Sequence, residues 1–336
     1  MNIRQLANIK IKYQRLCYTQ ILRLFVLCTI ALFLFGCGID RNIKKGEKFL
    51  AIGEYYDAAT QFKTAYQRTP AKDRTQRGQL AAKMAFCYDQ ISASQRAIAA
   101  YRNVIRYKQD NKDTHLKLAA NLMKTGAYPE AIKEYSIALD SMPDNDIARE
   151  GLAAATKAPT IKEQGSYYQV KKMDKFNSRK QDYSPMLFGD QYNQLYFTST
   201  RNEAQGDEIS GITGVKPGDI FVSEKDEKGK WGIPHAIESG LNSEADEGTP
   251  AFSVDGREVY ITQCLTDPTY PRFAQISVSS RADAAWGKPK KLEITRDTLS
   301  SFAHPALSPD GNWLYFVSDM PGGKGGLDIW RVRLIG

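Results

Sequence analysis

The sequence has little of what most enzyme active sites are built from. Its 336 residues include only three histidines, His115, His235 and His304, and five cysteines. No Gly-x-Ser-x-Gly, His-Glu-x-x-His, P-loop or paired-cysteine metal spacing occurs. These absences argue against hydrolytic, nucleotide-binding and zinc chemistry. We therefore expect that the protein is not an enzyme and that it binds no cofactor and no metal.

A concentrated basic region is also lacking, although the formal net charge is +8. Residues 1–36 carry five basic and no acidic residues, residues 38–159 carry 20 basic and 14 acidic, and residues 160–336 carry 21 basic and 24 acidic. No run of five or six like charges occurs. A nucleic-acid-binding protein should show a stronger basic footprint, so no nucleic-acid partner is predicted.

The N-terminal apolar run is too short to cross a bilayer comfortably. It covers the 12 residues 24–35, whereas a spanning helix needs about 20. Behind a basic segment, this length is typical of a signal peptide. The run ends in Leu34-Phe35-Gly36-Cys37, which resembles a bacterial lipobox with Phe35 at a position that is usually smaller. The resemblance implies cleavage after Gly36 and lipid on Cys37; a plain signal peptide or an uncleaved anchor helix is the alternative.

Removal of residues 1–36 leaves a simple set of cysteines. The residue after Cys37 is Gly38; an aspartate at this position would suggest retention in an inner membrane. We therefore expect a lipid anchor in the outer membrane, on its periplasmic face. Cys87 and Cys264 lie in different regions and are weak disulfide candidates. We expect Cys87 to be a buried, inert residue of a helix.

Residues 37–159 contain an internal repeat. Two sets have the same spacing: Gly53, Tyr55, Ala58, Phe62, Ala65 and Pro70, and Gly126, Tyr128, Ala131, Tyr135, Ala138 and Pro143. A third copy lies between them, at Ala85, Tyr88, Ala97 and Tyr101. The pattern resembles the tetratricopeptide repeat of about 34 residues. It predicts three helix pairs starting near Ile39, Gly78 and Lys112, a five-residue insertion at residues 71–75, and a capping helix over residues 146–157.

The spacing also predicts how these helices pack. Small residues at Gly46, Ala58, Ala97 and their equivalents let antiparallel helices approach closely, while aromatic residues fill the space between repeats. Pro70 and Pro143 should end the second helix of their repeats. Arrays of this kind usually present a concave groove to a protein partner. The alternative is a spacer between the lipid and the rest of the chain.

Residues 160–336 contain a second repeat, built from short alternating strands. Three blocks centre on Pro185, Pro250 and Pro305, and each contains a hairpin and a third strand. Asp-Gly pairs at 255–256 and 310–311 should form the hairpin turns. Outer strands are predicted at residues 230–232 and 285–287. The blocks resemble the TolB-like β-propeller repeat, which implies three blades. Because propellers have about four to eight blades, we expect a longer protein or a second chain to complete the ring.

A lipobox, tetratricopeptide repeats and a TolB-like propeller, in this order, resemble the PorE-like lipoproteins of the type IX secretion system, in the OmpA-like family of Bacteroidetes. The resemblance covers about 300 of the 336 residues. It implies an α + β multidomain chain: a signal peptide (1–36), a tetratricopeptide-repeat α-solenoid (37–159) and an incomplete β-propeller (160–336). It also implies a scaffold for protein partners of the cell envelope, with peptidoglycan bound only through domains absent from this chain.

Few individual residues stand out as site candidates. His304 begins an inner strand, near where a propeller channel would lie, and is a candidate for partner binding. His115 is expected to lie at the surface or to pack, and not to be a ligand. The alternative function is a surface or periplasmic propeller directed at glycans, in binding or glycosidase-like chemistry. Its candidate carboxylates are the loop pairs Asp207 and Glu208, and Asp246 and Glu247.

Overall fold

A computed structural model describes residues 38–165, 167–189, 191–206, 208–265, 274–282, 285–297 and 299–335. The chain divides into two compact units, Met1–Gly165 and Ser166–Gly336. The predicted lipidation site Cys37 lies outside the described residues. Within the described ranges, no helix combines the length and the apolar character that a bilayer crossing requires.

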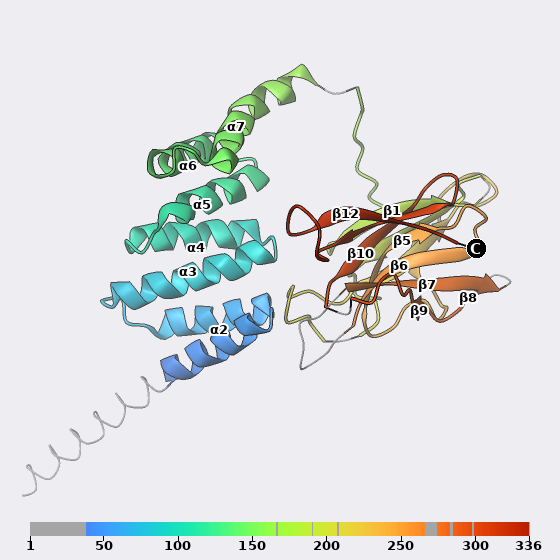
Figure 1. The fold of residues 1–336 in the computed structure, drawn as a ribbon, viewed down its shortest axis with the longest axis horizontal. Coiled ribbons are helices and arrows are strands. Elements are labelled where there is room, and N and C mark those ends of the chain that lie inside the picture. The colour runs from blue at the N-terminus through green and yellow to red at the C-terminus, as the bar shows by residue number, and fades with distance from the viewer. Residues whose placement is uncertain are drawn as a thin grey trace, which may run out of the picture. The chain divides into compact units, whose positions relative to one another are not determined.

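The first unit is a stack of helices (Figure 1). Residues 38–51 are helical and are followed by α2 (Tyr55–Arg68), α3 (Arg74–Gln90), α4 (Ser94–Arg106), α5 (Lys112–Lys124), α6 (Tyr128–Ser141) and α7 (Asp146–Gln164). From α2 onward each helix packs against the next, and α7 also packs against α5. Helix 38–51 with α2, α3 with α4, and α5 with α6 form three pairs of a tetratricopeptide-like solenoid. The last helix, α7, continues to Gln164, past residue 159.

The turn inside each helix pair has the same backbone geometry. Gly53, Ser92 and Gly126 adopt left-handed φ values of 77°, 53° and 75°. The residue after each of them donates its N–H to a carbonyl five residues back, in the pairs Glu54–Phe49, Ala93–Tyr88 and Ala127–Leu122. The three turns are therefore structural equivalents, although Ser92 replaces the glycine that this conformation favours.

The predicted small residues are the points of closest helix approach. Ala58, Ala97 and Ala131 are fully buried, beside the buried aromatic residues Phe62, Tyr101 and Tyr135. A Cβ atom added at Gly46 would lie 2.6 Å from the Phe62 ring. The packing prediction is therefore confirmed, because a larger side chain at these positions would separate the helices.

The helix ends follow the predicted breakers, and the insertion takes a specific form. Pro70 lies two residues beyond the end of α2, and Pro143 lies two residues beyond the end of α6. The inserted residues 71–75 form a turn and then begin α3, which starts four residues before the predicted repeat start at Gly78. The Asp73 side chain caps this extra turn by accepting the Gln76 N–H at 3.0 Å. The insertion thus consists of a turn at residues 71–73 and the first two residues of α3.

The second unit consists of three antiparallel sheets, in agreement with the three aligned blocks. The first contains β1 (Asp182–Phe188), β2 (Gln194–Ser199), β3 (Asp219–Glu224) and β4 (His235–Ala236) in sequence order. The second contains β5 (Asp246–Phe252), β6 (Glu258–Cys264), β7 (Ala274–Ala282), β8 (Ala285–Trp286) and β9 (Lys290–Lys291), with β8 and β9 both paired to β7. The third contains β10 (Phe302–Leu307), β11 (Trp313–Ser318) and β12 (Asp328–Arg333).

The outer strand predicted at residues 285–287 is confirmed as β8, whereas the one predicted at residues 230–232 is not a strand. Trp231 makes a single bridge, to Lys225, and the outer strand β4 begins four residues later. In the second sheet, β8 pairs with the end of β7, and the separate strand β9 pairs with its middle. The Gly232 and Gly287 N–H groups bond back to Glu224 and Ser280, which closes a tight hairpin at each position. Pairing with the middle of the preceding strand resumes only after this hairpin, at β4 in the first sheet and at β9 in the second.

The sheets pack face to face through apolar residues. One core lies between the first and second sheets, and includes Tyr196, Ile220, Phe252, Val259, Ile261 and Trp286. A second core lies between the second and third sheets, and includes Tyr260, Ile276, Phe302, Leu314 and Phe316. The first strand of the second sheet also contacts the first sheet, and the first strand of the third sheet contacts the second. The same face-to-face arrangement is therefore used twice.

A backbone irregularity recurs in the first strand of every sheet. Ser184, Thr249 and His304 have φ values of 53°, 52° and 55°, each directly before a proline. The hairpin register shifts at this point in all three sheets. Left-handed backbone is unfavourable for residues with a side chain, above all for β-branched Thr249. A strained conformation that occurs three times must be held by its surroundings.

A hydrogen bond from the neighbouring sheet supports two of these irregular positions. The Thr249 N–H donates to Thr198 Oγ1 on the first sheet at 3.0 Å. The His304 N–H donates to Thr262 Oγ1 on the second sheet at 2.9 Å. The same contact therefore links the second sheet to the first and the third sheet to the second.

The Asp-Gly turns are confirmed. Gly256 and Gly311 have φ values of 70° and 72°. The side chains of Asp255 and Asp310 accept the N–H groups of Arg257 and Asn312, each at 3.1 Å. These aspartates are therefore residues of the hairpin turns.

Candidate functional site

An exposed aromatic side chain, Phe86, lies between a residue of the first repeat and a residue of the third. Phe86 on α3 is 37% exposed. Its ring meets the edge of Tyr55 at 6.1 Å between centroids, and Lys117 Nζ on α5 lies 5.7 Å from the Phe86 ring centre. Three repeats thus contribute to one apolar position with an adjacent cation.

Charged contacts join α3 to helix 38–51 and to α5 near Phe86. Lys83 on α3 pairs with Glu47 on helix 38–51. Asp89 on α3 accepts from Asn121 Nδ2 at 2.8 Å and lies 3.6 Å from Lys124 Nζ, both on α5. We call the surface defined by Tyr55, Lys83, Phe86, Asp89, Lys117 and Lys124 the Phe86 surface. It combines an accessible aromatic ring with three lysines, which suits a partner segment that is apolar and acidic.

The remaining notable residues of the helical unit pack, as expected. His115 Nδ1 lies 2.6 Å from Glu134 Oε2, and its Nε2 lies 3.7 Å from Asp110 Oδ2. These contacts tie α5 to α6. Cys87 is fully buried, and this burial raises its thiol pKa to about 11. The prediction of a buried Cys87 on a helix is confirmed. A thiol that stays protonated at neutral pH is a poor nucleophile.

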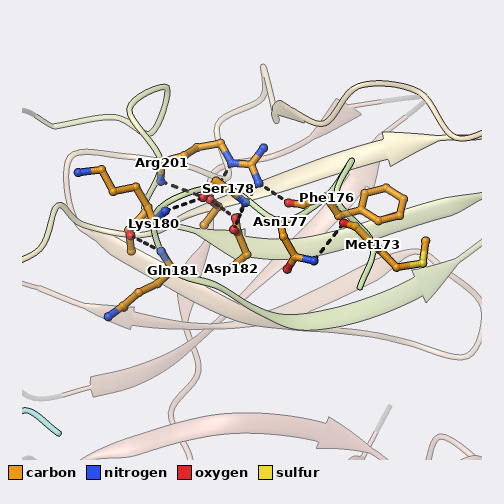
Figure 2. A network of polar contacts seen from close by, with 10 residues as sticks. Met173, Phe176, Asn177, Ser178, Lys180, Gln181, Asp182 and Arg201 are labelled. Carbon is orange, nitrogen blue, oxygen red and sulfur yellow. Dashed lines mark hydrogen bonds and ion pairs between the residues drawn. The ribbon is translucent and has the colours of Figure 1, made fainter. Parts of the chain in front are cut away.

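In the second unit a buried arginine organises a polar network (Figure 2). The Arg201 guanidinium contacts Asp182 Oδ1 at 2.6 Å through Nη2, and donates to Ser199 Oγ at 2.8 Å through Nε. The same Nη2 donates to the Phe176 carbonyl at 2.7 Å. The Ser178 N–H donates to Asp182 Oδ2 at 2.5 Å. This network therefore fastens the segment before β1 to the start of β1 and to Arg201, just after β2.

Electrostatics and aromatic packing reinforce this network. The Arg201 and Asp182 side chains are only 12% and 8% exposed. Burial alone would raise the pKa of Asp182, but hydrogen bonds from Arg201, Ser199 and Ser178 outweigh it and hold that pKa below its ordinary value. The guanidinium also lies 4.9 Å from the Phe221 ring centre. Sequence reasoning missed the pair, because Asp182 and Arg201 are 19 residues apart in unrelated parts of the repeat.

The network positions Phe176 over one face of the first sheet. The Phe176 ring lies 5.5 Å from Trp231 and 6.4 Å from Phe197, edge-on to both. Beside it lies an apolar cavity of about 540 Å³, lined by residues that include Met173, Pro185 and Leu187. The segment before β1 therefore covers part of a sheet face.

The candidate carboxylates have structural partners. Asp246 and Glu247 begin β5 and do not lie in a loop as predicted. Asp246 Oδ1 accepts the Gly218 N–H at 2.8 Å. Glu247 is fully buried and accepts from the Ser243 N–H at 3.0 Å and from Gln263 Nε2 at 3.1 Å. Both carboxylates therefore accept hydrogen bonds from neighbouring backbone and side-chain groups. Of the other pair, Glu208 is exposed and Asp207 lies outside the described residues.

A third buried carboxylate, Asp219, was not singled out from the sequence. It is fully buried at the start of β3, and its Oδ2 accepts the Gln205 N–H at 2.7 Å. Its Oδ1 has no hydrogen-bond partner among the described residues. Burial raises the pKa of Asp219 to about 6. Across the described ranges, no group of three or more His, Cys, Asp or Glu residues could hold a metal ion.

The backbone of His304 is held by the neighbouring sheet, and its side chain is exposed. Its N–H bonds to Thr262, its φ is 55°, and the side chain is exposed. Its role in partner binding stays a prediction.

Comparisons with known proteins find only structural likeness. No family model and no curated protein matches the chain. Among solved structures, the C-terminal tetratricopeptide domain of an FK506-binding protein from Plasmodium falciparum is 16% identical, covering 38% of this chain and 92% of that one, with a TM-score of 0.34. The first tetratricopeptide domain of RPAP3, solved with an HSP90 peptide, is 17% identical, covering 37% and 94%, with a TM-score of 0.31.

A third solved structure is of a different kind. A thermostable family-43 glycoside hydrolase is 18% identical, covering 48% of this chain and 57% of that one, with a TM-score of 0.30. The helix pairing and the repeated turn carry the fold assignment of the first unit. On that basis the first unit has a tetratricopeptide-like fold, and the second unit consists of antiparallel sheets.

Proposed function

We propose that this protein is a non-enzymatic scaffold that holds protein partners at the Phe86 surface. The observation that carries the proposal is the exposed Phe86 ring between Tyr55 and Lys117. Exposed aromatic side chains in folded proteins are often binding anchors, since leaving them in water is unfavourable. An apolar side chain of the partner covers the Phe86 ring, and acidic groups beside it meet Lys117 and Lys124.

The proposed site acts by position and charge. Tyr55 holds the Phe86 ring edge-on, so little side-chain freedom is lost when a partner docks. In the free protein Lys83 pairs with Glu47 and Lys124 pairs with Asp89, so part of the positive charge of the surface is neutralised before a partner binds. Binding through these lysines should weaken as salt increases.

We propose further that the three sheets are blades of a TolB-like β-propeller. The recurrence of the hairpin, the pre-proline bulge and the threonine-to-amide contact supports this, because propellers repeat one unit around an axis. The outer faces of the first and third sheets would meet further blades, from the same polypeptide or from a second chain. In this arrangement His304 is a partner-binding candidate.

The order of a lipobox, a helical array and three sheets supports placing the protein with the PorE-like lipoproteins of the type IX secretion system. In this proposal lipid on Cys37 anchors the chain in the outer membrane, on its periplasmic face. The partners are secretion-system proteins. Because Asp246 and Glu247 are engaged by backbone and side-chain donors, we propose no glycosidase role for them.

Co-purification from detergent-solubilised envelopes tests the proposal. The full chain is compared with the double variant Phe86→Ala/Lys117→Ala, and with Lys133→Ala at an exposed position of α6 as a matched control. We expect envelope proteins to be recovered with the parent and the control, and to be lost with the double variant. Equal recovery with all three, or recovery of polysaccharide alone, would contradict the proposal. Mass spectrometry of Cys37 tests the lipid anchor separately.

A further inference from the structure

Helix 38–51 carries a stripe of four exposed cations. Arg41, Lys44, Lys45 and Lys48 are all exposed. At 3.6 residues per turn they fall within an arc of about 100°. The opposite side of the helix holds Ile39, Ile43 and Leu50, which pack against the hydrophobic core. We call the four cations Arg41, Lys44, Lys45 and Lys48 the basic stripe.

Arg41 and Lys48 of the basic stripe occupy positions that are buried in the other repeats, whereas Lys44 corresponds to the partly exposed Lys83 and Lys117. Arg41 corresponds to Leu80 in the second repeat and to Thr114 in the third, which are 2% and 5% exposed. Lys48 corresponds to Cys87 and Asn121, both fully buried. In those repeats the preceding repeat covers these two positions. In the first repeat all four positions are exposed and cationic.

Solvation of a terminal repeat does not require one sign of charge. End repeats of solenoids need a polar outer face, which either sign provides. The helix at the other end of the array, α7, has mixed charges over its first twelve residues: exposed Asp146 and Glu150, and exposed Arg149 and Lys157. The acidic neighbours of the stripe are few, because Glu47 is paired with Lys83 and only Asp40 flanks it. The uniform sign of the stripe therefore points to an anionic partner.

We infer that the basic stripe binds the anionic headgroups of membrane phospholipids. The inference rests on the proposed lipid anchor at Cys37, because the stripe begins four residues after it. Four residues of any conformation reach at most about 14 Å, and Lys48 lies only about 10 Å further along the helix from Arg41. Four cations held this close to an anchored sulfur lie at the surface of the bilayer.

The stripe adds electrostatic attraction to the anchor. Basic residues beside an anionic bilayer each strengthen binding severalfold, and the attraction extends over about one Debye length. The stripe would also orient the helical unit, because one end of the array is held against the membrane. An acidic protein partner is the competing occupant, but it would not account for the position of the stripe next to Cys37.

Vesicle partitioning of the full chain tests the inference. The parent is compared with a stripe variant, Arg41→Gln/Lys44→Gln/Lys45→Gln/Lys48→Gln. A matched control removes four exposed cations elsewhere in the same unit, in the variant Lys63→Gln/Lys112→Gln/Lys133→Gln/Lys157→Gln. Each protein is mixed with vesicles of phosphatidylcholine alone, and with vesicles that also contain phosphatidylglycerol. The ratio of the two partition coefficients cancels the contribution of the apolar residues 24–35, which all three proteins share.

We expect the parent and the control to prefer the anionic vesicles, and the stripe variant to lose roughly tenfold or more of that preference. High salt should remove the preference of the parent as well. An equal preference in the parent and the stripe variant, or none in the parent, would overturn the inference and would leave an acidic protein as the occupant. Neither result depends on lipid at Cys37, which mass spectrometry reports independently.

Discussion

The buried carboxyl of Asp219 should make the second unit less stable as the pH rises. Burial raises its pKa from the ordinary 3.8 to about 6. The folded state therefore holds a proton that the unfolded state has released between these pH values. The contribution to stability is greatest below about pH 4, and it is lost as the pH rises through 6. The whole difference corresponds to about 3 kcal/mol.

The substitution Asp219→Asn isolates this effect. An amide retains an acceptor for the Gln205 N–H and carries no charge at any pH. The position of Oδ1 has no partner among the described residues, so the new NH₂ group breaks no hydrogen bond there. We expect the variant to match the parent at pH 4 and to be up to about 3 kcal/mol more stable at pH 8.

Urea denaturation followed by tryptophan fluorescence measures the effect. All four tryptophans, Trp231, Trp286, Trp313 and Trp330, belong to the second unit, so the signal reports that unit alone. The exposed Glu238→Gln serves as the control for loss of one negative charge. Asp246 and Glu247 also have raised pKa values caused by burial, so the parent should keep some of the same pH dependence after the substitution. A variant no more stable than the parent at pH 8 would refute the reasoning that burial dominates at Asp219.

Three further predictions concern the structural contacts. Arg201→Ala leaves the buried Asp182 carboxylate without its ion-pair partner, and should destabilise the second unit by about 3–5 kcal/mol in the same urea assay. Ser92→Gly places glycine at a left-handed turn, and should stabilise the helical unit by about 1 kcal/mol, measured by thermal melting with circular dichroism. Thr262→Val removes the acceptor for the His304 N–H, and should cost the second unit about 1–3 kcal/mol of unfolding free energy.

Each of these predictions has a matched comparison. The double variant Asp182→Asn/Arg201→Met should recover part of the stability lost in Arg201→Ala, because no unpaired charge remains buried. Gly126→Ala, at the equivalent turn, should destabilise the helical unit, and an unchanged melting temperature there would contradict the turn argument. Thr262→Ser keeps the hydroxyl, so it should remain closer to the parent than Thr262→Val.

Much of the helical unit follows from local pattern. Gly53 and Gly126 at equal spacing from Ala58 and Ala131 identified two repeats, because a repeat needs small residues where its helices cross. The exposure of Phe86 did not follow, since its position depends on how three helices stack. In the second unit the prolines and Asp-Gly turns located the hairpins. The outer strand of the first sheet was misplaced, because pairing there depends on where a hairpin closes in space.

The sequence by itself determined the division into a helical array and a set of antiparallel sheets, because periodicity and turn residues act over short distances along the chain. It also determined the candidate anchor at Cys37, which is a linear signal. Only the tertiary structure decided which polar groups are buried together. The Asp182–Arg201 pair, the raised pKa of Asp219 and the threonine contacts between sheets arise from residues distant in sequence. Such contacts depend on packing, which leaves no fixed spacing along the chain.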